Sequence, residues 1–224
     1  MRFSSAPAFA LVLSLVSLHT VAPGRASAQP AGSPPFLSLE ETEGLARRVD
    51  YEGMPEDEAV HIGPEGAARL VEMLADPEEQ PHHARILLAL GIWGGEGALE
   101  AMRDWASRSL NSGEGREIDR DRFRAWQVLP FALGKLAHRD PRAVAELAAC
   151  FDADPPAWSF RRFKGARLQA LERRAAVAAL AETRLPEAER VLDAVARRAG
   201  DPALADHVRA VRAAAEGVPD GGAR

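Results

Sequence analysis

The chain has 224 residues, 46% of them hydrophobic, and its 28 basic and 33 acidic side chains give a formal net charge of −5. This composition is typical of a globular protein and excludes a disordered chain. The excess of acid argues against a nucleic-acid partner, because binding phosphates needs surplus lysine and arginine. The single cysteine, Cys150, excludes a disulfide framework, so the fold has to rest on its hydrophobic core.

Residues 1–28 have the three parts of a secretory signal peptide. Arg2 gives a basic start, an apolar run follows from Ala8 to Leu18, and Ala26-Ser27-Ala28 supplies small residues for cleavage. The apolar run is far shorter than the ~20 residues that a membrane-spanning helix needs. We therefore expect cleavage after Ala28, an exported protein that is periplasmic or secreted, and no membrane span. An uncleaved amphipathic anchor is the alternative interpretation.

The segments after the cleavage site predict one helical domain between two flexible ends. Residues 29–37 are rich in proline, glycine and serine and read as a linker, residues 38–216 as the domain, and residues 217–224 as a disordered tail. Ser38 and Glu41 have the spacing of a capping box, in which the two side chains satisfy free N–H groups at the start of a helix.

From Pro64 onward the apolar residues recur with helical spacing. Ala67, Leu70, Val71 and Leu74 lie on one face of a helix. Further helices are predicted to begin at Pro81, after Gly97, near Phe123, at Pro141, near Ala166, at Pro186 and at Pro202. Because no segment alternates apolar and polar residues with a period of two, the predicted class is all-α.

A short motif recurs along these helices. Ala89-Leu90-Gly91 returns 43 residues later as Ala132-Leu133-Gly134, and a weaker copy, Ala179-Leu180-Ala181, follows after another 47 residues. Periods near 40–47 residues with two helices each are typical of helical solenoids, whose stacked helix pairs share one core. We expect the glycine of each motif to let the chain leave the helix with a positive φ.

This pattern resembles the HEAT family, and most closely the HEAT-like repeats of the phycobilisome lyase type. The matching residues are the two Ala-Leu-Gly motifs, Asp140-Pro141-Arg142-Ala143 at the turn within a repeat, and Pro130 inside a first helix. The resemblance covers residues 62–216 and implies a right-handed α-solenoid of stacked antiparallel helix pairs that serves as a binding surface. The chain departs from the family pattern in its third copy, which lacks the glycine, and in long loops at 108–121 and 152–165.

The segment 152–167 is the richest candidate for binding. It mixes aromatic and basic side chains, which suit an interface because aromatics supply buried area and arginines pair with carboxylates. The candidate binding residues are Trp158, Phe160, Arg161, Arg162, Phe163 and Lys164. In the alternative interpretation the aromatics close the groove between repeats and the basic side chains are merely solvated. If the segment binds, the expected partner is a protein of unknown identity.

The sequence contains no set of residues that predicts catalysis or a cofactor. The Gly-x-Ser-x-Gly, His-Glu-x-x-His and phosphate-loop motifs are all missing. A calcium loop counted from Asp152 fails, because its sixth and twelfth places hold Ala157 and Phe163. His82 and His83 point about 100° apart on a helix, so we expect exposed polar residues rather than a metal pair. Cys150 lies on an apolar helical stripe and is interpreted as an inert buried thiol.

Together these observations predict an exported, non-enzymatic HEAT-like repeat protein that acts as a protein-protein interaction scaffold or adaptor. Two alternatives remain open. One is a lyase-like protein that binds a small molecule or chromophore in the concave groove, and the other is a structural subunit of an envelope complex.

Overall fold

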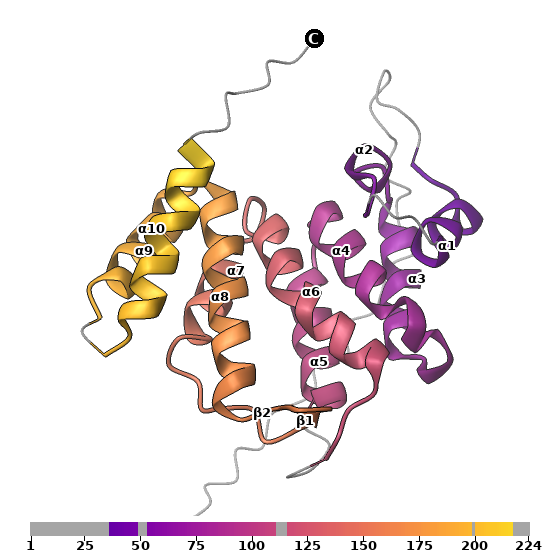
Figure 1. The fold of residues 1–224 in the computed structure, drawn as a ribbon. Coiled ribbons are helices and arrows are strands. Elements are labelled where there is room, and N and C mark those ends of the chain that lie inside the picture. Colours follow the sequence, from indigo (N-terminus) through magenta and orange to yellow (C-terminus); the bar gives the residue numbers. More distant parts are fainter. Residues whose placement is uncertain (1–35, 49–52, 111–115, 199, 217–224) are drawn as a thin grey trace, which may run out of the picture. The chain divides into compact units, whose positions relative to one another are not determined.

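The computed structural model describes residues 36–48, 53–110, 116–198 and 200–216, all within the unit of the chain that begins at Pro34. Figure 1 shows this unit. The predicted signal peptide at 1–28, most of the linker and the tail at 217–224 lie outside the described residues.

Helices make up most of the described chain, which confirms the all-α class. They are α1 (Leu39–Arg47), α2 (Glu56–Ala59), α3 (Pro64–Ala75), the 3-10 helix η1 (Pro77–His82), α4 (His83–Trp93), α5 (Ala98–Leu110), α6 (Arg120–Leu136), α7 (Arg142–Ala149), α8 (Ala166–Thr183), α9 (Pro186–Ala196) and α10 (Pro202–Glu216). Two short strands, β1 (Ser159–Phe160) and β2 (Phe163–Lys164), lie in the predicted loop between α7 and α8. No helix of the described residues is long and apolar enough to cross a bilayer.

The capping box at the start of the domain is confirmed. The Glu41 N–H donates to Ser38 Oγ at 3.2 Å, and the Ser38 N–H donates to Glu41 Oε2 at 2.8 Å. The domain nevertheless begins before Ser38, because the Leu37 N–H donates to the His61 carbonyl at 2.9 Å. The end of the predicted linker is therefore part of the fold.

Helices α4, α6 and α8 lie side by side and carry the repeated motif (Figure 1). A Cβ atom placed on Gly91 of α4 would lie only 2.4 Å from the carbonyl oxygen of Ala132 in α6. A Cβ atom on Gly134 of α6 would lie 3.2 Å from the carbonyl oxygen of Ala179 in α8. The third residue of each Ala-Leu-Gly motif therefore packs on the first residue of the next motif.

This packing corrects the predicted role of the glycines. Gly91 and Gly134 lie inside helices, so neither ends its helix. The positive φ that ends α4 belongs to Gly94, whose φ is 65° and whose N–H donates to the Leu90 carbonyl at 2.9 Å. At Gly91, only a residue without a side chain lets the two backbones approach so closely.

Ion pairs also connect residues that are one repeat period apart. Arg103 in α5 donates from Nε to Glu146 in α7 at 3.0 Å, across 43 residues of sequence. Lys135 in α6 donates to Glu182 in α8 at 2.6 Å, across 47 residues. Equivalent positions of successive helix pairs are therefore neighbours in space.

The core contains one histidine that the sequence analysis placed on the surface. His83 begins α4 and is only 5% exposed, because α5 covers it. Its Nδ1 accepts a hydrogen bond of 3.0 Å from the indole of Trp105, and its Nε2 lies 3.3 Å from the Asp76 carbonyl. An indole can only donate, so Nε2 carries the ring proton. The prediction of an exposed side chain is therefore wrong for His83.

Candidate functional site

The predicted binding residues form a β-hairpin between α7 and α8. Strands β1 and β2 are antiparallel, and Phe160 pairs with Phe163 across a turn made by Arg161 and Arg162. The Ile118 N–H donates to the Ser159 carbonyl at 2.8 Å, which ties the chain before α6 to the hairpin. The hairpin is thus tied by backbone hydrogen bonds to the segment that leads into α6.

The aromatic side chains of the hairpin face the helices. Phe160 stacks on Phe123 of α6, with ring centroids 4.0 Å apart and planes 12° from parallel. Trp158 meets Trp126 of α6 edge to face at 5.0 Å. Trp158 and Phe160 are buried and Phe163 is half-buried. These three aromatics therefore close the space beside α6, as the alternative interpretation of the segment has it.

The basic side chains of the hairpin have a different environment. Arg161, Arg162 and Lys164 are exposed, and none of the three forms an ion pair within the described part of the chain. The guanidinium groups of Arg161 and Arg162 lie over the rings of Phe160 and Phe163, at 5.2 and 5.8 Å from the centroids. The six predicted residues are therefore adjacent, but only the three cations offer a free surface.

The tip of the hairpin stores backbone strain. Arg161 has a φ of 53°, in the left-handed region that favours glycine. Its N–H donates to the Glu117 carboxylate at 2.9 Å, which helps to hold this conformation. Strained residues persist where the surrounding structure holds them, and they gather at functional sites.

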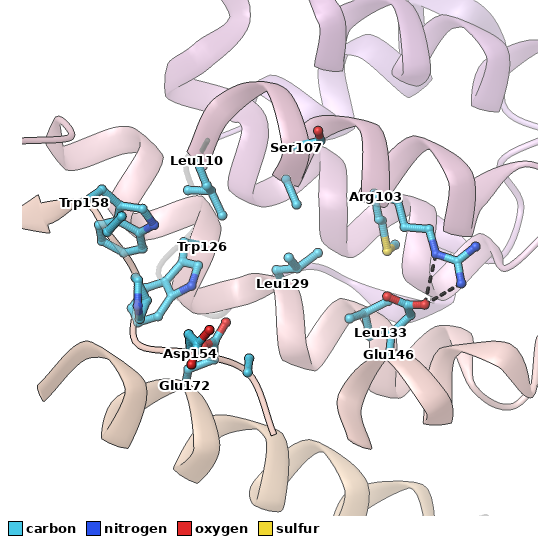
Figure 2. Close-up of a pocket in the computed structure, with 15 residues that line it drawn as sticks. Arg103, Ser107, Leu110, Trp126, Leu129, Leu133, Glu146, Asp154, Trp158 and Glu172 are labelled. Atoms are coloured by element: carbon cyan, nitrogen blue, oxygen red, sulfur yellow. Dashed lines mark hydrogen bonds and ion pairs between the residues drawn. The ribbon is translucent and has the colours of Figure 1, made fainter. Parts of the chain in front are cut away.

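A pocket of about 530 Å³ opens beside the hairpin, between α5, α6, α7, α8 and the segment that leads into β1 (Figure 2). Its walls are mainly apolar and include Met102, Leu110, Leu129, Leu133, Trp126 and Trp158. Of the six predicted binding residues, only Trp158 contributes to this pocket. A ligand in the groove is one of the alternatives that the sequence leaves open, but the sequence does not indicate which residues line this pocket.

The pocket also has charged residues at two places. Arg103 and Glu146 form their ion pair on one side, while Asp154 and Glu172 lie on the side of the two tryptophans (Figure 2). Burial raises the pKa of the Glu172 carboxyl, and a hydrogen bond from the Trp126 side chain lowers it in part.

A signal in the sequence could have found Glu172. Leu168, Ala176 and Leu180 are fully buried and mark the apolar face of α8 in steps of four residues. Glu172 occupies the place between Leu168 and Ala176 in the same series. A carboxylate in an apolar helical stripe is costly without compensation and therefore indicates a special environment.

Cys150 lies near the pocket acids without lining the pocket. Its thiol is half-buried, and Sγ donates to the Glu146 carbonyl at 3.6 Å. Burial raises the pKa of the thiol to about 12, and the charge of Glu172 adds to the shift. The nucleophilic thiolate is therefore suppressed, in agreement with the interpretation of Cys150 as inert.

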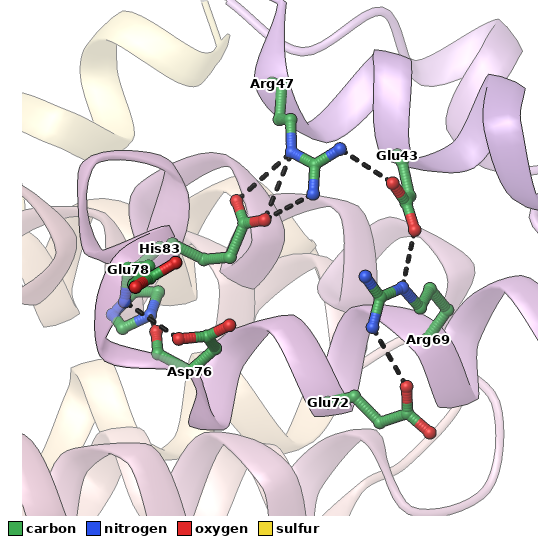
Figure 3. Close-up of polar contacts among 8 residues, drawn as sticks. Glu43, Arg47, Arg69, Glu72, Asp76, Glu78 and His83 are labelled. Atoms are coloured by element: carbon green, nitrogen blue, oxygen red, sulfur yellow. Dashed lines mark hydrogen bonds and ion pairs between the residues drawn. The ribbon is translucent and has the colours of Figure 1, made fainter.

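A second concentration of charge joins the N-terminal helices (Figure 3). Glu43 of α1 accepts hydrogen bonds from Arg47 at 2.6 Å and from Arg69 of α3 at 2.5 Å, and these bonds lower the pKa of its carboxyl. Arg47 also donates from Nε to Glu79 of η1 at 3.1 Å. Because each arginine bridges two carboxylates, this cluster ties helices together and leaves no carboxylate pair free for acid–base chemistry.

The described residues contain no group of three or more histidine, cysteine, aspartate or glutamate side chains that could hold a metal ion. Comparison with known protein families, with curated proteins and with solved structures gives no match for this chain. The function therefore has to be argued from the geometry of the molecule itself.

Proposed function

We propose that the protein is an exported, non-enzymatic scaffold or adaptor, built as a HEAT-like right-handed α-solenoid, that binds a partner protein through the tip of the β-hairpin. The exposed cations Arg161, Arg162 and Lys164 form the centre of this surface. The observation that carries the proposal is their arrangement: exposed basic side chains with no ion pair lie beside aromatic side chains that pack against α6.

The repeated packing supports the solenoid. The same contact, a motif glycine against the alanine of the following motif, joins α4 to α6 and α6 to α8. Ion pairs with the spacing of the repeat accompany it. Units that repeat one contact stack in one direction, and such stacks offer long surfaces to partners.

The rigidity of the hairpin supports a binding role. Phe160 and Phe163 are held against Phe123, with centroid distances of 4.0 and 6.2 Å, so the turn that carries Arg161 and Arg162 has little freedom. Preorganised arginines lose less entropy when they bind a carboxylate, and arginine can do so with two parallel hydrogen bonds. An acidic surface on a protein is the partner chemistry that this tip favours.

Capture of a partner from an extract of the source cells tests the proposal. The bait is the full chain, and its variant replaces Arg161, Arg162 and Lys164 with glutamine. Trp158 and Phe160 stay unchanged, because both are buried and their loss would disturb the fold. A control variant replaces the exposed Arg108, Arg174 and Arg197 with glutamine, which makes the same change in net charge on other helices.

We expect one protein to be retained by the wild type and the control and lost with the hairpin variant. Its binding is then measured with both proteins purified, at low and high salt, because contacts between charges at the rim of an interface weaken with ionic strength. Equal retention by all three baits would refute the hairpin as the site. Isolation of the protein only as a permanent part of a larger assembly would favour a structural subunit instead.

N-terminal sequencing of the protein recovered outside the cytoplasm tests the export part of the proposal. A mature chain that begins at Gln29 is the expected result. A chain that keeps residues 1–28 would contradict cleavage.

A further inference from the structure

The pocket beside the hairpin has the size of a small-ligand site. Its volume of about 530 Å³ lies within the range of roughly 300–1,000 Å³ that is usual for such sites. Leu129 and Leu133 of α6 and Met102 of α5 provide apolar surface along it. A ligand with an apolar body would therefore gain buried area here without displacing any protein segment.

The pocket lining has an excess of negative charge. Arg103 is the only basic side chain in the lining, and it is occupied by Glu146, which accepts from its Nε at 3.0 Å. Asp154 and Glu172 have no ion pair within the described residues. The pocket thus presents two uncompensated carboxyl groups and no uncompensated cation.

The charged groups of the pocket also act against an anion. A hydrogen bond from the Trp126 side chain lowers the pKa of Glu172 in part, so this donor acts on the carboxyl group. The carboxyl groups of Asp154 and Glu172 would repel a carboxylate or phosphate, and the basic side chain of the lining, Arg103, is already paired with Glu146. This arrangement disfavours acidic ligands, including a chromophore that carries carboxylates.

The two tryptophans favour a particular kind of cation. The rings of Trp126 and Trp158 stand at 84° to each other with centroids 5.0 Å apart, and both contribute to the wall near Asp154 and Glu172 (Figure 2). The face of an indole attracts a cation within about 6 Å, and aromatic walls with nearby charge are the usual means of holding alkylated ammonium groups.

We propose that this pocket binds a small organic cation, an alkylammonium group on an apolar body, with the charged group beside Glu172, Asp154 and the two tryptophans and the apolar body along Met102, Leu129 and Leu133. The cation would give Glu172 an ion pair on the side of the pocket, in addition to the charge of the neighbouring Arg173, which already lowers its pKa in part. This site is independent of the hairpin tip and of the partner proposed for it.

Isothermal titration of the full chain with three probes of equal chain length tests the proposal. Octyltrimethylammonium carries the predicted group, octanol is its neutral counterpart and octanoate its anionic one. We expect the cation to bind more tightly than octanol, and octanoate to bind at least about ten-fold more weakly than the cation, because the carboxyl groups and indole faces attract a quaternary ammonium group and the carboxyl groups repel a carboxylate.

The variant Glu172→Gln removes the charge and keeps an acceptor for the Trp126 N–H. It should lower the affinity for the cation by about ten-fold, because a Coulombic attraction is lost, and leave octanol binding unchanged. Asp104→Asn is the matched control, because Asp104 lies on α5 next to Arg103 but is exposed and outside the pocket lining. This control should bind the cation as the wild type does.

The indole N–H signals in an NMR spectrum locate the bound probe. The chain has 4 tryptophans, and the signals of Trp126 and Trp158 should shift on addition of the cation, while that of the core residue Trp105 should not. No binding of the cation, equal binding of octanoate, or equal affinity of the wild type and Glu172→Gln would each overturn the proposal. None of these results affects the test of the hairpin, which uses different residues and a different ligand.

Discussion

Substitution of Gly91 by alanine tests the close contact between α4 and α6. The added Cβ would lie 2.4 Å from the carbonyl oxygen of Ala132 and 3.0 Å from its carbonyl carbon and Cα. All three atoms are backbone, so no side-chain rotation can relieve the clash. Helices α4 and α6 would have to separate along their most extensive contact.

The expected loss is the difference between two opposing effects. Overpacking a well-packed core costs about 1–3 kcal/mol, and a clash with backbone belongs at the upper end of that range. Replacing a glycine inside a helix by alanine returns about 1 kcal/mol. We therefore expect Gly91→Ala to lower the free energy of unfolding by about 2 kcal/mol.

Gly134→Ala is the matched control. Its Cβ would lie 3.2 Å from the Ala179 carbonyl oxygen and 3.3 Å from the Ala179 Cβ, a contact that a shift of a few tenths of an ångström relieves. A steric cost of about 1 kcal/mol is then offset by the same gain in helix propensity. The stability of this variant should stay within about 0.5 kcal/mol of the wild type.

Urea unfolding followed by circular dichroism measures both variants. With a slope of about 2 kcal/mol per molar urea, the midpoint of Gly91→Ala should fall by about 1 M, while that of Gly134→Ala should hardly move. Equal stability of Gly91→Ala and the wild type would refute the close packing of α4 on α6. An equal loss in both variants would refute the distinction between the two contacts.

Three further predictions concern buried titratable groups. Because burial raises the pKa of Glu172, ionising this group costs stability above the ordinary glutamate pKa. Glu172→Gln should therefore be more stable than the wild type at neutral pH, and the two should have equal stability in acid. Urea unfolding at several pH values checks this. Because burial raises the pKa of Cys150 to about 12, iodoacetamide at about pH 8 should alkylate the folded chain far more slowly than the unfolded chain, and equal rates would contradict it. Burial lowers the pKa of His83, and its Nδ1 accepts a hydrogen bond from Trp105, so stability should decline as the pH falls from the ordinary histidine pKa through the lowered value. His83→Gln should not show this decline. A variant with the same pH profile as the wild type would contradict the prediction.

Local signals in the sequence placed the helices well. The capping box at Ser38 was found from two residues, and α3, α9 and α10 begin with prolines that the sequence marks as helix starts. Such signals act within one turn of the chain, so they do not depend on what lies beside the helix. The same is true of the helical spacing of apolar residues.

The misread glycines and the misread histidine depend on neighbouring helices. Gly91 looks like a helix end in the sequence, but its role is set by Ala132, which lies 41 positions away in the chain. His83 reads as an exposed polar residue, but α5 covers it and Trp105 supplies its hydrogen bond. Neither neighbour can be recognised from the residues next to the glycine or the histidine.

Within the hairpin segment, too, the sequence indicates some features and the packing decides others. The sequence identified its six residues as a group, because aromatic and basic types alternate there. Only the structure separated Trp158, Phe160 and Phe163, which pack inward on α6, from the three cations that face outward. A two-residue turn between paired strands decides this, since it reverses the chain and presents both turn residues, Arg161 and Arg162, at the tip.

By itself, therefore, the sequence determined the helical class, the start of most helices, the repeated motif and the segment most suited to binding. Only the tertiary structure decided what the motif glycines are for, which aromatic residues are buried, and that a pocket with two uncompensated carboxyl groups lies beside the hairpin. The physical reason is distance along the chain. Helix formation is governed by residues within a turn of each other, whereas the pocket is made by five separate segments between residues 102 and 172 that meet only when the helices pack.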